Sequence, residues 1–149
     1  MDEAGADNNE DYGYGWCASC ERFSAMKLGH KTERVNMIAG WRNREVLAPM
    51  TFKGSCNTDL VEAWVEQWLV PQLQAGNVVV IDNASFHKSA AIRESIEQAG
   101  CALLFLPPYS PDLNKIEKFW ARLKHYLRKT LNQFENFWDA VDNAFKLVS

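Results

Sequence analysis

The sequence predicts an α/β fold in which a mixed sheet is flanked by helices. Strand-like patterns come first, and from about residue 57 onward segments with helical spacing alternate with short apolar runs, as in α/β domains. The chain of 149 residues is long enough for one domain with a sizeable core. Its apolar content of 47%, with six Trp and eight Phe, favours a packed globule over disorder.

The first third of the chain is expected to supply strands. Residues 1–12 have almost no apolar content and predict a loop, and residues 13–20 are a candidate short strand. Over residues 34–41 apolar side chains recur at every second position, which predicts a strand. A polar turn then leads into a second strand at about 45–52, where Pro49 suits a sheet edge or a bulge.

The middle of the chain reads as a helix followed by an apolar strand. Asn57 or Thr58 can cap a helix whose apolar residues repeat at helical spacing, and Pro71 tends to end or kink that helix. Residues 78–81 are Val-Val-Val-Ile, a run too apolar for a sheet face that is open to water. We therefore predict a central strand that is buried on both sides.

The remaining segments predict a helix, a strand and two further helices. A short helix is expected over 89–98 and ends before Gly100. Residues 102–106 predict another buried strand, which two prolines close. Apolar spacing predicts an amphipathic helix from Asn114 onward and a last helix over about 133–147, so the whole chain reads as one α/β domain.

Hydropathy argues against membrane and secreted classes. No run approaches the roughly 18 apolar residues of a membrane span, so no membrane partner is expected. The first residues are acidic and polar, which does not match a secretory signal. A cytoplasmic location is therefore the default expectation.

The four cysteines are expected to be reduced thiols. Cys17 and Cys20 form a CxxC pair, but Cys56 and Cys101 do not make the second close pair that a zinc site needs. A redox CxxC normally opens a helix after a strand, and this pair lies in Gly- and Tyr-rich sequence instead. Zinc and redox roles are thus disfavoured.

Charge is distributed unevenly although the net charge is only −3. Residues 1–11 carry five acidic side chains and no basic one, whereas residues 113–130 carry six basic side chains against a single acid. This pattern suits a molecule with one metal-binding face and one phosphate-binding face. A solvated helix face explains the basic run equally well.

Two carboxylates, Asp82 and Glu117, stand out by position. Asp82 follows the apolar run 78–81 at the carboxyl end of a predicted strand, where open α/β sheets bind ligands, although it could equally start a turn. Asn114 and Glu117 have capping-box spacing, which would also direct the Glu117 carboxylate at the end of the sheet. Spacing leaves both interpretations open for each residue.

Three sequence segments carry a family resemblance. VVVIDNASFHKS, LPPYSPDLNKIEKFWARLK and the opening DEAG resemble the catalytic domain of bacterial insertion-sequence transposases in the Tc/mariner superfamily, over about residues 2–130. The resemblance implies an RNase H-like fold and a DDE catalytic triad. By motif match, the triad falls on Asp2, Asp82 and Glu117.

The resemblance also implies cofactors, partners and an activity. Two Mg²⁺ or Mn²⁺ ions would be held mainly by Asp82, with Asp2 bridging and Glu117 on one side, because hard cations prefer oxygen ligands. The implied reaction is cleavage of double-stranded DNA at transposon ends and strand transfer of those ends into a target.

Side chains near the motifs are the expected nucleic-acid contacts. His87 would lie near the site, where it could contact phosphate or orient a carboxylate, and a capping or surface role is the alternative. Lys88 follows it directly. Lys118, Arg122 and Lys124 lie on the polar side of the predicted helix and could follow the DNA backbone.

The sequence departs from the family pattern at its start. Only Met1 precedes Asp2, so the first strand is expected to be largely missing, and the family's upstream helix-turn-helix region is absent. We therefore predict a truncated transposase with an RNase H-like catalytic domain over 1–130, a packed C-terminal helix over 131–149, and impaired transposition. The alternative is a non-catalytic transposase remnant that acts only as a DNA-binding or protein-pairing module. A homodimer, or pairing with a full-length transposase, is the expected protein partnership.

Overall fold

The computed structural model describes residues 1–8, 33–108 and 110–148. Three strands, β1 (Asp2–Asp7), β2 (Arg34–Arg42) and β3 (Glu45–Phe52), form an antiparallel sheet in that order. Two strands, β4 (Val78–Ile81) and β5 (Ala102–Phe105), pair in parallel beside it. The mixed α/β architecture agrees with the prediction.

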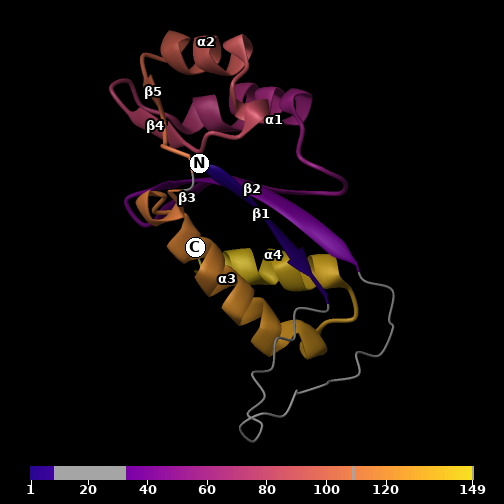
Figure 1. The fold of residues 1–149 in the computed structure, drawn as a ribbon. Coiled ribbons are helices and arrows are strands. Elements are labelled where there is room, and N and C mark those ends of the chain that lie inside the picture. Colours follow the sequence, from indigo (N-terminus) through magenta and orange to yellow (C-terminus); the bar gives the residue numbers. More distant parts are fainter. Residues whose placement is uncertain (9–32, 109, 149) are drawn as a thin grey trace, which may run out of the picture.

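Helices lie on both sides of the strands (Figure 1). In the part of the chain that the structure describes, the α-helices are α1 (Thr58–Trp64), α2 (Ala90–Gln98), α3 (Glu117–Thr130) and α4 (Phe137–Val148). The helix that starts with α1 continues as a π-helical turn (Val65–Leu69) and a 3-10 turn (Val70–Gln72). Further 3-10 turns cover Ser85–His87, Pro111–Leu113 and Leu131–Gln133.

β2 lies between β1 and β3, and both of its faces are buried. Val35, Met37 and Ala39 pack into a core shared with α3 and α4, and the neighbouring Ile38 packs into a second core shared with α1 and α2. The period-two pattern of the sequence therefore places alternate side chains in two separate helical layers. This three-layer arrangement positions every element of the site described below.

The hairpin between β2 and β3 follows its prediction. Asn43 and Arg44 make the turn with φ angles of 49° and 73°, as a two-residue hairpin requires. The pairing register shifts between Ile38 and Gly40, where Ala48 has a φ of 49° next to Pro49. The expected bulge at the proline is thus present on a strand at the edge of its sheet.

The loop predicted for residues 1–12 is wrong over its described part. β1 is a six-residue strand that pairs with β2 from Asp2 opposite Ala39 to Asp7 opposite Arg34, so the expectation that the first strand would be largely missing is corrected. Ala6 is only 2% exposed. Small and polar side chains hide this strand from an apolar-pattern search, because backbone pairing and close packing need no bulky residue here.

The expectation that β4 and β5 are buried on both sides is also wrong. In the described residues β4 pairs only with β5, and Val78 and Leu104 are 57% and 53% exposed. One face packs against α1 and α2 through Val79 and Ile81. The amino group of Met1 donates a 2.7 Å hydrogen bond to the Val80 carbonyl, which joins the start of β1 to the free edge of β4.

Helix boundaries mostly follow local sequence signals. Asn57 caps α1 by accepting from the Leu60 amide, and Ser89 caps α2 by accepting from the Ala91 amide. Gly100 follows α2 with a φ of +73°. The last helix, α4, packs on the same core as α3, as predicted, while the boundary between residues 130 and 131 remains a prediction.

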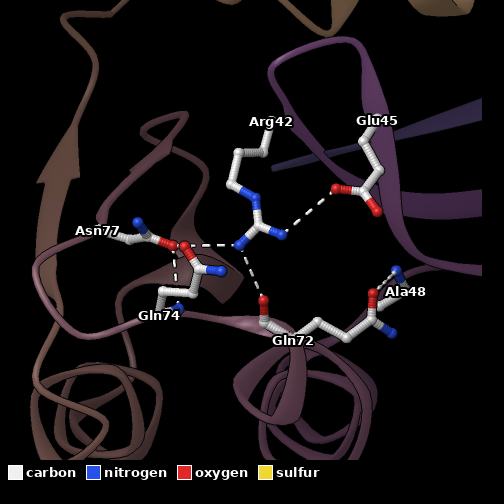
Figure 2. A network of polar contacts seen from close by, with 6 residues as sticks. All are labelled: Arg42, Glu45, Ala48, Gln72, Gln74 and Asn77. Carbon is white, nitrogen blue, oxygen red and sulfur yellow. Dashed lines mark hydrogen bonds and ion pairs between the residues drawn. The ribbon is translucent and has the colours of Figure 1, made fainter.

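Arg42 is the centre of a polar network that links the two sheets (Figure 2). Its guanidinium donates to the Gln72 carbonyl at 3.0 Å, to Asn77 Oδ1 at 3.4 Å and to Glu45 Oε2 at 3.3 Å. The Gln72 side chain in turn accepts from the amide of Ala48 at 3.1 Å. β2, β3 and the segment that leads into β4 are therefore held together at this end.

Cysteines and hydropathy add two findings. Cys56 and Cys101 are free thiols, as expected, and Cys17 and Cys20 lie outside the described residues, as does the candidate strand at 13–20. Among the helices that the structure describes, none is long and apolar enough to cross a membrane.

We predict that Arg42→Met lowers the free energy of unfolding by about 1 kcal/mol, because one partly buried and two exposed hydrogen bonds are lost while the apolar stem is kept. Urea denaturation at neutral pH measures the change. Arg93→Met is the matched control, since its contact with Glu97 joins side chains that are 48% and 53% exposed, and its expected effect is below about 0.5 kcal/mol. Equal losses in the two variants would contradict the bridging role.

Candidate active site

Asp82 is the first residue after β4, at the carboxyl end of that strand. Its Oδ1 atom accepts two hydrogen bonds, one from the Ala84 amide at 3.1 Å and one at 2.5 Å from Nδ1 of His87. The bond from His87 is the main cause that lowers the pKa of the Asp82 carboxyl. Asp82 thus starts a turn and also keeps an ionised carboxylate, so the two interpretations left open by the sequence are compatible.

His87 lies in the 3-10 turn Ser85–His87 and is fully buried. Its Nε2 atom is 3.2 Å from Oε2 of Glu3, so the ring lies between two carboxylates. Burial by itself lowers the pKa of His87, but the contacts with Asp82 and Glu3 outweigh it and raise the value to about 9. Of the roles proposed from the sequence, the geometry supports orientation of a carboxylate.

Asp2 opens β1 and is only 6% exposed. Burial, followed by the negative charges of Glu3 and Glu117, raises the pKa of Asp2 to about 7. A carboxylate held in such surroundings is destabilised when it ionises without a compensating cation. Asp2 is therefore the member of the site whose charge most needs a positive partner.

Glu117 is the first residue of α3, and its carboxylate is exposed. Ile116 occupies the capping position without a side-chain hydrogen bond, and the Glu117 amide donates to the backbone carbonyl of Asn114 at 3.1 Å. The capping-box interpretation is therefore wrong, because the helix starts three residues later than Asn114. The Glu117 carboxylate is free to face the end of the sheet.

One cavity brings the three predicted carboxylates together. It has a volume of about 340 Å³ and is lined by Asp2, Asp82 and Glu117, together with the turn after β4 and the segment after β5. The tightest set of ligand atoms is Asp2, Glu3 and Asp82, which lie within 4.8 Å of one another. Glu117 shares the cavity wall but is not in that tight set.

Glu3 is the site residue that the sequence interpretation missed. It lies inside the quoted DEAG segment, directly after Asp2, and this adjacency was the available signal. Because residues 1–12 were predicted to form a loop, there was no face of a strand on which to place Glu3.

The sequence matches a known protein family. The family described as "DDE superfamily endonuclease" matches residues 1–139. The chain belongs to the DDE superfamily endonucleases. Family membership confirms the resemblance to DDE transposases that the motifs indicated, and no finding bears on a bacterial origin.

Relatives agree with the assignment. The transposable element Tc1 transposase of Caenorhabditis elegans is 31% identical over 91 residues, which is 56% of this chain and 33% of that protein. The chain thus spans about a third of that relative. Mos1 transposase in a paired-end complex with the left transposon end has a TM-score of 0.60 at 15% identity, covering 99% of this chain and 52% of that one.

Two further structures show the same fold. The Mos1 strand transfer complex has a TM-score of 0.61 at 16% identity, covering 97% of this chain and 44% of that one. The catalytic core domain of BIV integrase has a TM-score of 0.50 at 16% identity, covering 72% of this chain and 77% of that one. The RNase H-like fold expected from the sequence is confirmed.

A DDE endonuclease uses divalent metal, and the residues present fit one. The cavity brings together the carboxylates of Asp2, Asp82 and Glu117, a set of oxygen ligands of the kind that hard divalent cations prefer. Burial, followed by the charges of Glu3 and Glu117, raises the pKa of Asp2, so the ionised form of Asp2 would gain from a cation in the cavity. The imidazole of His87 is occupied by two carboxylates, and the set resembles an oxygen site more than a zinc site.

The predicted nucleic-acid contacts differ in accessibility. Lys88 and Lys118 are exposed near the cavity, and Lys124 is half-buried. Arg122 is exposed but donates a 2.9 Å hydrogen bond to the Val148 carbonyl at the end of α4. His87 is fully buried. The exposed lysines are thus the predicted residues most available to a phosphate backbone.

We predict that Asp2→Asn stabilises the metal-free protein at pH 8 by up to about 4 kcal/mol, because the pKa of Asp2 is raised by about three units and each unit corresponds to about 1.4 kcal/mol. The pKa of Asp2 rises from 3.8 to about 7 on folding, so its carboxyl does not destabilise the folded state below pH 3.8. The destabilisation grows as the pH rises from 3.8 to about 7 and has its full size above pH 7. Thermal unfolding in EDTA at pH 4 and pH 8 measures the difference.

The same variants test metal binding. Saturating Mg²⁺ should raise the melting temperature of the wild type and raise that of Asp2→Asn much less. Asp7→Asn, at the other end of the same strand, is the matched control, and it should keep the full response to Mg²⁺. An equal response in all three proteins would contradict a metal site at Asp2.

Proposed function

We propose that this domain catalyses metal-dependent cleavage of DNA strands and transfer of the resulting ends, as in DNA transposition. The observation that carries the proposal is the convergence of Asp2, Asp82 and Glu117 on one cavity from β1, the end of β4 and the start of α3. Carboxylates from three separate elements are a costly arrangement that metal-assisted phosphoryl transfer requires.

Two Mg²⁺ or Mn²⁺ ions are the proposed cofactors, held by Asp2, Asp82 and Glu117. When bound, such ions supply an activated water or 3′-hydroxyl and stabilise the leaving oxygen. Asp82 contributes a carboxylate that is already ionised, because the contact with His87 holds its pKa low. Asp2 contributes a buried carboxylate whose ionised form gains most from a cation.

Double-stranded DNA, at transposon ends and at a target, is the proposed substrate. Lys118 directly follows Glu117 on α3, and Lys88 directly follows His87, so both exposed ammonium groups lie on segments that form the site. Lysines there would hold the phosphate backbone near the carboxylates without reading sequence. Arg122 and Lys124 are proposed to extend this contact along α3.

We predict that Asp82→Asn and Glu117→Gln each lower Mg²⁺-dependent nicking of supercoiled DNA by at least about 100-fold, since loss of charge stabilisation at a reacting centre typically costs 10²–10³. Conversion of supercoiled to open-circular plasmid over time gives the rate. Asp7→Asn should nick like the wild type, and EDTA should abolish nicking.

The same assay separates the enzyme from a non-catalytic module that only binds DNA or pairs with another transposase subunit. Wild-type protein that binds Mg²⁺ and DNA but never nicks would support the module. Nicking that survives Asp82→Asn would point to a contaminating nuclease and overturn the proposed site.

We predict that Lys118→Gln weakens DNA binding and lowers the slope of log affinity against log salt by about 1, as expected when one phosphate contact is lost. Fluorescence anisotropy with a labelled duplex at several salt concentrations measures both. Lys146→Gln is the control, because Lys146 lies near Pro49 and Thr51, beside β3. An unchanged slope for Lys118→Gln would contradict a phosphate contact at Lys118.

A further inference from the structure

We infer that Glu3 is a positioning residue, which orients the Asp82 carboxylate through the buried ring of His87. This inference rests on the proposed function, because Asp82 is taken as a metal ligand. The observation behind it is a series of contacts in which Glu3 touches His87 and His87 touches Asp82. Glu3 belongs to β1, whereas Asp82 and His87 belong to the segment that follows β4.

The first contact fixes the orientation of the Asp82 carboxylate. Nδ1 of His87 lies 2.5 Å from Oδ1 of Asp82, and the Ala84 amide donates to the same oxygen. Both protein donors thus meet one oxygen of the carboxylate. Oδ2 is left to a ligand in the cavity that Asp82 lines. The rotation of the carboxylate therefore depends on where the imidazole ring stands.

The second contact fixes the orientation of the His87 imidazole ring. Nε2 of His87 lies 3.2 Å from Oε2 of Glu3, and His87 is fully buried, so solvent does not compete for that nitrogen. Both atoms are buried, and within the described residues neither has an aligned hydrogen-bond partner. At this distance, the buried Nε2 of His87 and Oε2 of Glu3 form an ion pair, and removal of either side chain would leave the other polar atom buried without a partner.

Strand alternation separates Glu3 from the cavity. Asp2 and Ala6 are on one face of β1, and Ala6 packs in the core of α3 and α4. Met1 packs in the other core, with α1 and α2, and Glu3 shares that face by the period of two. Glu3 is not among the residues that line the carboxylate cavity, although it lies within 4.8 Å of Asp2 and Asp82.

Two roles for Glu3 are therefore distinguishable. A direct metal ligand must reach the cavity and would act without His87. A positioning residue acts through the ring, and groups that orient metal ligands typically change metal affinity by about 10–100-fold when removed. The cavity lining and the contact with Nε2 favour positioning.

The test is a double-mutant cycle on Mn²⁺ affinity, measured by calorimetry on the 149-residue chain. We expect Glu3→Ala to weaken Mn²⁺ binding about 10-fold, and Glu3→Gln, which keeps an oxygen acceptor toward His87, to stay within about twofold of wild type. In a His87→Gln background, Glu3→Ala should have no further effect. Glu66→Ala, at an exposed glutamate, is the control for charge alone.

Several results would overturn the inference. Glu3→Gln as damaging as Asp82→Asn would make Glu3 a ligand, and an equal loss from Glu3→Ala in both backgrounds would make its effect independent of His87. No loss in either background would deny it any role. If Glu3→Ala does not fold, as judged by circular dichroism, Glu3→Asp replaces it in the cycle, because the shorter side chain cannot reach Nε2.

Failure of the proposed function gives a different result. If Asp82→Asn binds Mn²⁺ as tightly as the wild type, the metal site itself is wrong and both proposals fall. If Asp82→Asn abolishes binding while the Glu3 cycle is flat, only the positioning role is lost.

Discussion

Repulsion among carboxylates is the constraint around which this structure is organised. Asp2, Glu3 and Asp82 offer oxygen atoms within 4.8 Å of one another, and like charges at that distance oppose folding. The imidazole of His87 lies between two of the three and offsets part of the repulsion. Burial, and after it the charges of Glu3 and Glu117, raise the pKa of Asp2, which faces the cavity where a cation would be held.

The site is located at the junction of two sheets, and its geometry therefore depends on how those sheets are joined. Asp2 belongs to the antiparallel sheet and Asp82 to the parallel pair. The Met1 amino group bridges them beside the carboxylates, and Arg42 bridges them at the last residue of β2, three positions after Ala39, the partner of Asp2. A shift of one sheet against the other would separate Asp2 from Asp82, so residues that do not line the cavity contribute to its shape.

Elements with strong local signals were predictable from the sequence. The β2–β3 hairpin, the caps at Asn57 and Ser89 and the chain reversal at Gly100 are encoded by residues next to each feature. β1 was missed because its side chains are small or acidic, and its pairing with β2 spans residues far apart in the chain. The start of α3 was placed too early because Asn114 and Glu117 have capping spacing, which tertiary packing did not use.

The sequence by itself determined the chemistry that is available here. Asp2, Asp82 and Glu117 were assigned through the resemblance of their sequence motifs to a known family, because spacing alone left a capping or turn role open for Asp82 and Glu117. Only the tertiary structure decided how those groups are held: that His87 is buried, that it touches Asp82 and Glu3, and that Glu117 is free of its cap. Burial and contact between distant segments arise from the packing of layers, and no local pattern of residues records them.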